Sequence, residues 1–158
     1  MPGRVEHIFV CLRHRLPMKP VEQAEAILDQ GLKGCAHGRV GSRRQVLLMD
    51  SKTLEGFGIS PGAAKENLSI RGLDLRGLEA GQRLQAGEAQ LEVTLPCEPC
   101  GRMDDIRQGL QVELRGRRGM LCRVVGGGII RRGDAIELCP LGVAEPTAAE
   151  RSGVERTE

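Results

Sequence analysis

The stretch RLQAGEAQLEVTL, residues 83–95, decides the fold class of this chain. Two strand-type runs, residues 83–86 and 89–95, lie on either side of Gly87-Glu88, and a two-residue connection of this kind predicts a β-hairpin. Helical segments are too few to alternate with strands, so the pattern predicts a mainly β barrel with a few short helices. Further short strand-type runs, several of them next to glycine turns, occur at residues 5–12, 46–49, 67–70, 120–125, 129–130 and 134–138.

The expected helices are short. Residues 51–55 are expected to form a brief helix capped by Asp50 or Ser51. Residues 21–29 contain both good helix formers and an alternating pattern, so propensity leaves this segment ambiguous. Residues 104–114 are expected to form one helix, because apolar side chains recur there at a spacing of four residues, at Ile106, Leu110 and Leu114.

The composition excludes several classes of function. The chain has 158 residues with 22 glycines and 6 cysteines, but its only aromatic side chains among Phe, Trp and Tyr are Phe9 and Phe57. Nucleic-acid binders that stack bases on exposed rings are therefore not expected. The 23 Lys and Arg nearly balance the 21 Asp and Glu, so no overall field attracts nucleic acid or membrane.

The length fits one domain, which we expect at residues 5–140, because domains cluster near roughly 100–150 residues. Residues 141–158 contain little apolar content and are expected to form a disordered tail. No apolar run approaches the roughly 20 residues of a membrane span, and the first residues lack a signal-peptide core. We expect a soluble, cytoplasmic protein whose cysteines stay reduced.

Two cysteines stand three residues apart in the loop PCEPCG, residues 96–101. A position just before a helix is expected to favour thiolate, the form that attacks sulfur or binds soft metals. A redox pair, half of a zinc site, one functional thiolate and two incidental cysteines all remain open interpretations. The other cysteines are isolated in the sequence: Cys11, Cys35, Cys122 and Cys139.

Basic residues occur on glycine-bearing segments, at Arg43-Arg44, at Arg71 and in RGRRG, residues 115–119. Arginine binds phosphate or carboxylate through two parallel hydrogen bonds, and glycine lets backbone amides approach an anion. An anion site and an ordinary solvated surface both fit these clusters. His37, in the glycine-spaced loop of residues 31–41, fits a surface, structural or functional role.

A series of short motifs follows in a fixed order along the chain. They are GLKG with His37, RQV at 44–46, PG at 61–62, ENL at 66–68, RG at 71–72, LEAGQRL at 78–84, GEA at 87–89, PCEPC at 96–100, RGM at 118–120 and GD at 133–134. Together they resemble the MOSC domain, which is found at the C-terminus of molybdenum cofactor sulfurases and as short stand-alone bacterial proteins. The resemblance covers about residues 5–138.

The resemblance implies a β-barrel with a pocket for the molybdenum cofactor (molybdopterin) or a related sulfur-containing ligand. Cys100 matches the family's key thiol, which either carries sulfur as a persulfide or binds molybdenum directly. Cys97 matches a more variable position. For residues 21–29 the family pattern favours a strand, which we expect because tertiary pairing overrides propensity.

The resemblance also implies a set of ligand-binding residues. Asn67 and Arg71 fall where the family lines its pocket. Arg118 matches a basic residue suited to the phosphate of the cofactor, and His37 matches a recurring pocket histidine. We therefore expect Arg118 and Arg71 to bind phosphate and Asn67 and His37 to orient the ligand.

One position departs from the family pattern. The family usually reads Gly-Asp-x-His in the glycine loop, and here Cys35 replaces the acid. The change removes a group that would orient the ligand or handle protons. We therefore expect impaired or altered function and rank it above one alternative. That alternative makes Cys35 a second sulfur ligand beside Cys100.

The resemblance predicts a stand-alone MOSC-like protein that binds the molybdenum cofactor and moves sulfur through Cys100. Nothing resembles the lysine site of a pyridoxal-phosphate lyase domain, so a separate cysteine desulfurase or a molybdoenzyme is the expected partner. Neither nucleic acid nor membrane is expected as a partner. The first alternative is a non-catalytic module that binds a small anion in the same pocket. The second is a zinc-binding structural protein that uses Cys97, Cys100 and Cys122.

Overall fold

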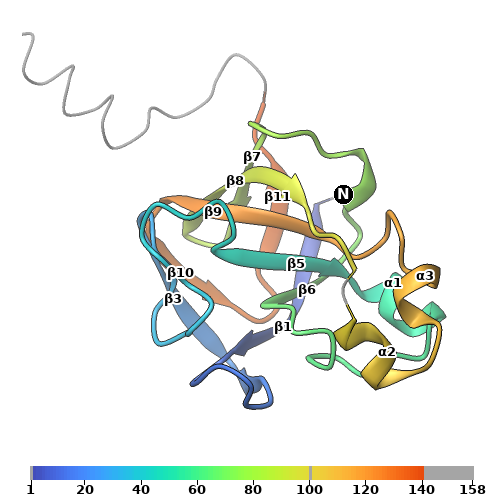
Figure 1. The fold of residues 1–158 in the computed structure, drawn as a ribbon. Helices are drawn as coiled ribbons and strands as arrows, with labels where there is room; N and C mark the ends of the chain where they lie inside the picture. The colour runs from blue at the N-terminus through green and yellow to red at the C-terminus, as the bar shows by residue number, and fades with distance from the viewer. Residues whose placement is uncertain (1, 100, 141–158) are drawn as a thin grey trace, which may run out of the picture.

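The chain folds into β-strands with a few short helices (Figure 1). The computed structural model describes residues 2–99 and 101–140, so Cys100 and the tail expected at 141–158 lie outside the described residues. The strands are β1 (Gly3–Val10), β2 (Lys19–Val21), β3 (Gln23–Ile27), β4 (Gly31–Leu32), β5 (Val46–Asp50), β6 (Leu68–Arg71), β7 (Arg83–Ala86), β8 (Ala89–Pro96), β9 (Met120–Gly126), β10 (Gly128–Arg131) and β11 (Ala135–Leu138). The helices are α1 (Ser51–Gly56), the 3₁₀ helix η1 (Leu75–Gly77), α2 (Arg102–Ile106) and α3 (Leu110–Glu113).

Seven strands close into a barrel. Their order is β11-β7-β8-β9-β5-β6-β1, and β1 pairs with β11 to complete the ring. All neighbours in the ring are antiparallel except β5 and β6, which are parallel. Strand β2 extends β1 at the edge, and β10, β3 and β4 form a separate three-stranded sheet. The expected mainly β barrel is confirmed.

Strand β5 is buried on both faces and joins two apolar cores. Val46 and Leu48 belong to the larger core, which the inward side chains of the barrel strands form. Leu47 and Met49 point to the other face and belong to a second core. That core packs the helices against the outside of the barrel, at one end of β5 in Figure 1, with side chains from α1, α2 and α3.

Elements specified by local sequence form as expected. Strands β7 and β8 make the hairpin around Gly87-Glu88, with Ala86 opposite Ala89. Helix α1 begins after Asp50, whose side chain accepts a hydrogen bond from the backbone N–H of Lys52. The ambiguous segment at 21–29 contains strand β3, which pairs with β10, so the expected strand is confirmed.

The prediction of a single helix at residues 104–114 is wrong. Two short helices, α2 and α3, stand there instead, separated by Arg107 in an extended conformation and Gly109 in the left-handed region. Leu110 is fully buried, whereas Ile106 is 36% exposed, so the apolar spacing does not mark one continuous face. No helix in the part of the chain that the structure describes is long and apolar enough to cross a membrane.

Gly119 lets the start of β9 pass very close to β5. Its φ is +117°, and a Cβ atom at this position would lie 2.2 Å from the carbonyl oxygen of Leu48. The Gly119 carbonyl also accepts a hydrogen bond of 2.9 Å from the backbone N–H of Cys97. A side chain here would therefore disturb both the β5–β9 pairing and the position of the cysteine loop.

We predict that Gly119→Ala lowers the free energy of unfolding by at least about 2 kcal/mol, because it combines a strained φ with a backbone clash. Urea denaturation followed by circular dichroism measures the change. Gly56→Ala is the matched control, because no atom lies within 4 Å of the added methyl group and φ at Gly56 lies outside the left-handed region. The control should change stability by less than about 1 kcal/mol, and an equal loss in both variants would contradict the explanation.

Candidate functional site

A cavity of about 310 Å³ lies against the outer face of β5 and β9, next to the helices. Five segments supply its walls: the loops after β1 and β4, the loop before β6, the cysteine loop after β8, and the turn before β9. We call it the cationic cavity. Its lining residues are His14, His37, Arg39, Ser42, Arg44, Leu47, Lys65, Asn67, Cys97, Met103, Arg118 and Leu121.

The charge of this cavity is one-sided. Four of its lining residues are cations and none is a carboxylate. Within the described residues, the salt bridges of the protein involve none of these four cations. Since the whole chain is almost neutral, the concentration of positive charge here is local and suits an anionic ligand.

Arg118 is the buried cation of the cavity, at 5% exposure. Its Nη2 donates to the carbonyl of Ala64 at 2.5 Å, and its Nη1 donates to the Met49 sulfur at 3.1 Å. A thioether is a weak acceptor, and the Nε of Arg118 has no hydrogen-bond partner among the described residues. A buried guanidinium with an unpaired donor beside a cavity can bind an anion through charge-assisted hydrogen bonds.

Glu66 supports the turn that holds Arg118. Its carboxylate is fully buried and accepts a hydrogen bond of 2.7 Å from the N–H of Gly62 and one of 3.3 Å from the hydroxyl of Ser69. Burial raises the pKa of Glu66, although these hydrogen bonds and the charge of Arg118 act in the opposite direction. Glu66 thereby fixes the turn whose Ala64 carbonyl accepts from Arg118.

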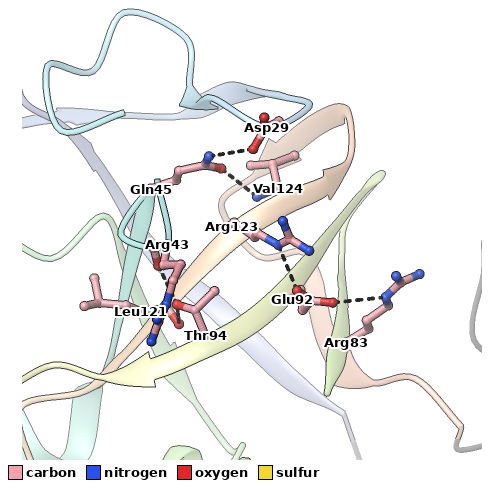
Figure 2. Close-up of polar contacts among 9 residues, drawn as sticks. All are labelled: Asp29, Arg43, Gln45, Arg83, Glu92, Thr94, Leu121, Arg123 and Val124. Atoms are coloured by element: carbon pink, nitrogen blue, oxygen red, sulfur yellow. Dashed lines mark hydrogen bonds and ion pairs between the residues drawn. The ribbon is translucent and has the colours of Figure 1, made fainter. Parts of the chain in front are cut away.

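Gln45 anchors the loop before β5, which carries Arg39 and Arg44; Figure 2 shows the Gln45 amide between Asp29 and Val124. The amide nitrogen of Gln45 donates to the Asp29 carboxylate at 3.2 Å and to the Arg39 carbonyl at 3.1 Å. Its amide oxygen accepts from the N–H of Val124 at 3.0 Å. Because Gln45 is only 1% exposed, these bonds hold the loop firmly against the barrel wall.

Thr94 makes a second attachment of the same loop. Figure 2 shows its hydroxyl between two carbonyls, those of Arg43 and Leu121, and the Leu121 contact measures 2.9 Å. The same view shows Glu92 between Arg123, at 2.8 Å, and Arg83, at 3.8 Å. Arg83 and Arg123 on this part of the barrel wall thus share a carboxylate, whereas no salt bridge among the described residues involves the cations of the cationic cavity.

Asn67 lines the cavity, but its side chain is engaged in the fold. Its Oδ1 accepts from the N–H of Leu47 at 2.9 Å, and its Nδ2 donates to the Phe9 carbonyl at 3.1 Å and to the Cys35 sulfur at 3.4 Å. These bonds join β1, β5 and the glycine loop at one buried point. The structure gives Asn67 a positioning role beside its predicted role in orienting a ligand, which stays a prediction.

Cys35 lies behind Asn67 and is 8% exposed. Its sulfur accepts hydrogen bonds from the N–H of Cys11, at 3.3 Å, and from the Asn67 amide. It is absent from the residues that line the cationic cavity within the described chain. This position gives no support to the alternative in which Cys35 is a second sulfur ligand.

Both predicted and unpredicted residues meet at the mouth of the cavity. His37 lines it, with its ring 6.1 Å from that of His14, and its role in orienting a ligand stays a prediction. The sequence reasoning missed His14, Arg39 and Lys65. A signal was present, because residues 7–21 and 30–49 contain no Asp or Glu, and His14 and Arg39 lie in these segments.

The structure does not bring Arg71 to the cationic cavity. Its Nε donates to Glu6 at 2.7 Å and its Nη2 contacts Glu55, so two carboxylates balance its charge. These ion pairs, above all the hydrogen bond to Glu6, raise the pKa of Arg71, and the Arg71 contact is the main cause that lowers the pKa of Glu6. Arg71 lines a different, open cavity together with Arg4 and other charged residues, so its predicted binding of phosphate stays untested.

The cysteines divide between the two cores. Cys97 is 9% exposed and belongs to the second core, outside the barrel. Cys122 is fully buried in the larger core inside the barrel, and this burial raises its pKa. Thiolate is the form that binds zinc, so the raised pKa of Cys122 argues against the zinc alternative, as does the location of Cys97 and Cys122 in different cores. The described residues contain no group of three His, Cys, Asp or Glu that could hold a metal. Cys11 is buried as expected for a core residue, and Cys139 is only half-buried.

Several solved structures have a similar fold, among them the following three. The YuaD protein of Bacillus subtilis is 19% identical, with a TM-score of 0.76 over 87% of this chain and 96% of that chain. YiiM of Geobacillus stearothermophilus is 21% identical, with a TM-score of 0.71 over 98% of this chain and 84% of that chain. YiiM of Escherichia coli is 19% identical, with a TM-score of 0.65 over 96% of this chain and 76% of that chain. At this identity the likeness shows the fold alone.

Sequence comparison identifies the family. A search of the curated proteins gave no match. The family model described as the MOSC domain matches residues 39–137, which include β5 to β10, most of β11, and the cavity residues from Arg39 to Leu121. Because this match spans more than half of the chain, the protein belongs to the MOSC domain family.

Proposed function

We propose that this protein binds the molybdenum cofactor, or a related sulfurated pterin-type ligand, in the cationic cavity and carries sulfur on Cys100. The observation that carries the proposal is Arg118, a buried cation with an unpaired Nε that lines a cavity without carboxylates. Membership of the MOSC family supports the choice of ligand.

The residues of the cavity fit a ligand with a phosphate group. Arg118 would hold the phosphate through parallel hydrogen bonds, and Arg44 and Lys65 would add charge from the surrounding loops. His37 would contact the ligand at the mouth, while Asn67 fixes the wall behind it. When bound, the cofactor supplies a metal centre that accepts a sulfur ligand.

The sulfur step uses the thiol of Cys100 and a persulfide donor. The Cys100 thiolate attacks the terminal sulfur of the donor persulfide, the donor's S–S bond breaks, and the donor leaves as a thiolate. A new S–S bond then holds the transferred sulfur on Cys100. No oxidant is needed, because the donor already carries the sulfur in the persulfide form. A separate cysteine desulfurase is the proposed donor, and a molybdoenzyme is the proposed recipient of the loaded cofactor.

Arg118→Gln tests the binding site. We expect it to weaken binding of phenyl phosphate, a simple phosphate monoester, about 10- to 100-fold, because hydrogen bonds to charged groups contribute about 1.5–3 kcal/mol. Titration calorimetry gives the dissociation constant. Molybdenum retained after incubation with cofactor released from a molybdoenzyme, and then desalting, should fall in parallel.

Arg123→Gln is the matched control, since Arg123 is paired with Glu92 outside the cavity and its loss should leave both readouts unchanged. Equal binding by wild type and Arg118→Gln would refute the proposed site. Arg71→Gln tests the prediction that Arg71 binds the phosphate of the ligand. Weaker retention of the cofactor by that variant would show that the ligand extends to Arg71.

Cys100→Ser tests the sulfur step. After incubation with a cysteine desulfurase and L-cysteine, the wild-type protein should gain the mass of one sulfur atom on the peptide that contains Cys100, and the variant should not. Phenyl phosphate binding should be retained in the variant, because that binding depends on Arg118. Cys97→Ser serves as the neighbouring control.

A Cys100→Ser protein that still acquires the extra sulfur would overturn the assignment of Cys100. A wild-type protein that binds the cofactor but never acquires sulfur would instead be a non-catalytic binding module.

A further inference from the structure

Cys97 also borders a second cavity, separate from the cationic one. This cavity has a volume of about 200 Å³ and lies where η1, α1, the cysteine loop and the start of β9 come together. We call it the apolar cavity. Its lining residues are Asp50, Thr53, Leu75, Arg76, Leu78, Ala80, Pro96, Cys97, Glu98, Gly116, Arg117, Gly119 and Met120.

The chemistry of the apolar cavity differs from that of the cationic cavity. Its buried wall is formed by Leu75, Leu78 and Met120, which are 3%, 9% and 7% exposed. Its charged residues balance, with two carboxylates (Asp50 and Glu98) and two arginines (Arg76 and Arg117). An anion therefore gains no net attraction here, whereas an uncharged molecule can bury its apolar surface.

Asp50 and Thr53, at the start of α1, are two of the polar side chains that line this cavity. Asp50 is held in place because its Oδ1 caps α1 by accepting from the N–H of Lys52 at 2.9 Å. Its second carboxylate oxygen and the Thr53 hydroxyl are groups that a ligand could meet in the cavity. A few fixed polar groups beside a mainly apolar wall are typical of sites for small organic molecules.

We propose that the apolar cavity is a second binding site, which takes a small uncharged organic molecule with an apolar body and a hydrogen-bond donor directed at Asp50. The volume is adequate, because apolar cavities of about 150 Å³ in proteins bind benzene. Cys97 separates this site from the cationic cavity, so the two sites present an anion and an uncharged molecule to the same cysteine loop. The second site stands apart from the proposed sulfur chemistry, since its occupation requires neither cofactor nor persulfide.

Benzyl alcohol is the probe, because it combines an apolar ring with a hydroxyl donor. In a titration followed by two-dimensional amide NMR, it should shift the resonances of Leu75, Leu78 and Met120. Benzoate has a similar size but is an anion, and it should instead shift residues of the cationic cavity such as Arg118. Phenyl phosphate binding, measured in the same sample, reports on the proposed function separately.

Ala80→Trp fills the apolar cavity from its exposed side. We expect it to weaken benzyl alcohol binding at least about 10-fold and to leave phenyl phosphate binding unchanged. Ala80→Lys is the control, since a long flexible side chain can turn into solvent without filling the cavity. Should Ala80→Trp not fold, Thr53→Phe fills the same space from α1.

The proposal is overturned if benzyl alcohol shifts no resonance of the apolar cavity in the wild-type protein. It is also overturned if the cavity-filling variants bind benzyl alcohol as well as the wild type does. Either result leaves the Arg118 and Cys100 tests unaffected, so failure of the second site and failure of the proposed function are distinguishable.

Discussion

The burial of β5 on both faces is the constraint on which the rest of the structure depends. Val46 and Leu48 fill the barrel, while Leu47 and Met49 support the helices outside it. Each buried side chain of this kind contributes roughly 1.5–3 kcal/mol before the entropy cost of folding is counted, so truncating any one of them would remove a large fraction of a domain's small net stability. The second core packs on the outer face of β5, and the cationic cavity lies against it through Leu47 and Met103, whereas Leu75, Leu78 and Met120 of the larger core line the apolar cavity. The strand thus shapes the wall of the cationic cavity as well as the closed barrel.

Burial leaves the hydrogen-bonding capacity of Arg118 only partly used. A guanidinium taken out of water needs hydrogen bonds to replace its hydration, and here the protein offers one carbonyl and one thioether. The fold thus carries the cost of an incompletely solvated cation, and an anion in the cavity would offset it. Among the salt bridges of the described residues none joins Glu66 to Arg118, although the charge of Arg118 acts to lower the pKa that burial raises in Glu66.

Local signals in the sequence were sufficient for some elements and insufficient for others. The β7–β8 hairpin and the Asp50 cap depend on residues close in sequence, and both were predicted. The prediction of one helix at residues 104–114 was wrong because Gly109 adopts a left-handed conformation that the apolar spacing does not reveal. Arg71 and Arg118 both lie on glycine-bearing segments of the sequence. Arg71 forms an ion pair with Glu6, 65 positions away, whereas the Nε of Arg118 has no hydrogen-bond partner among the described residues. Which arginine faces the cavity is decided by tertiary contacts, so neither composition nor spacing separates the two.

Cys35 shows how the cavity accommodates its departure from the family pattern. Its sulfur accepts from the N–H of Cys11 and from the Asn67 amide, so it provides an acceptor at the place where the family usually has an acid. Asn67 also bonds to β1 and β5, so Cys35 is part of the network that holds this wall of the cavity. A carboxylate at this position would bring a negative charge close to a cavity lined by four cations, and the neutral thiol does not. Among the described residues the lining of the cationic cavity thus contains no carboxylate, which supports the anionic ligand proposed for it.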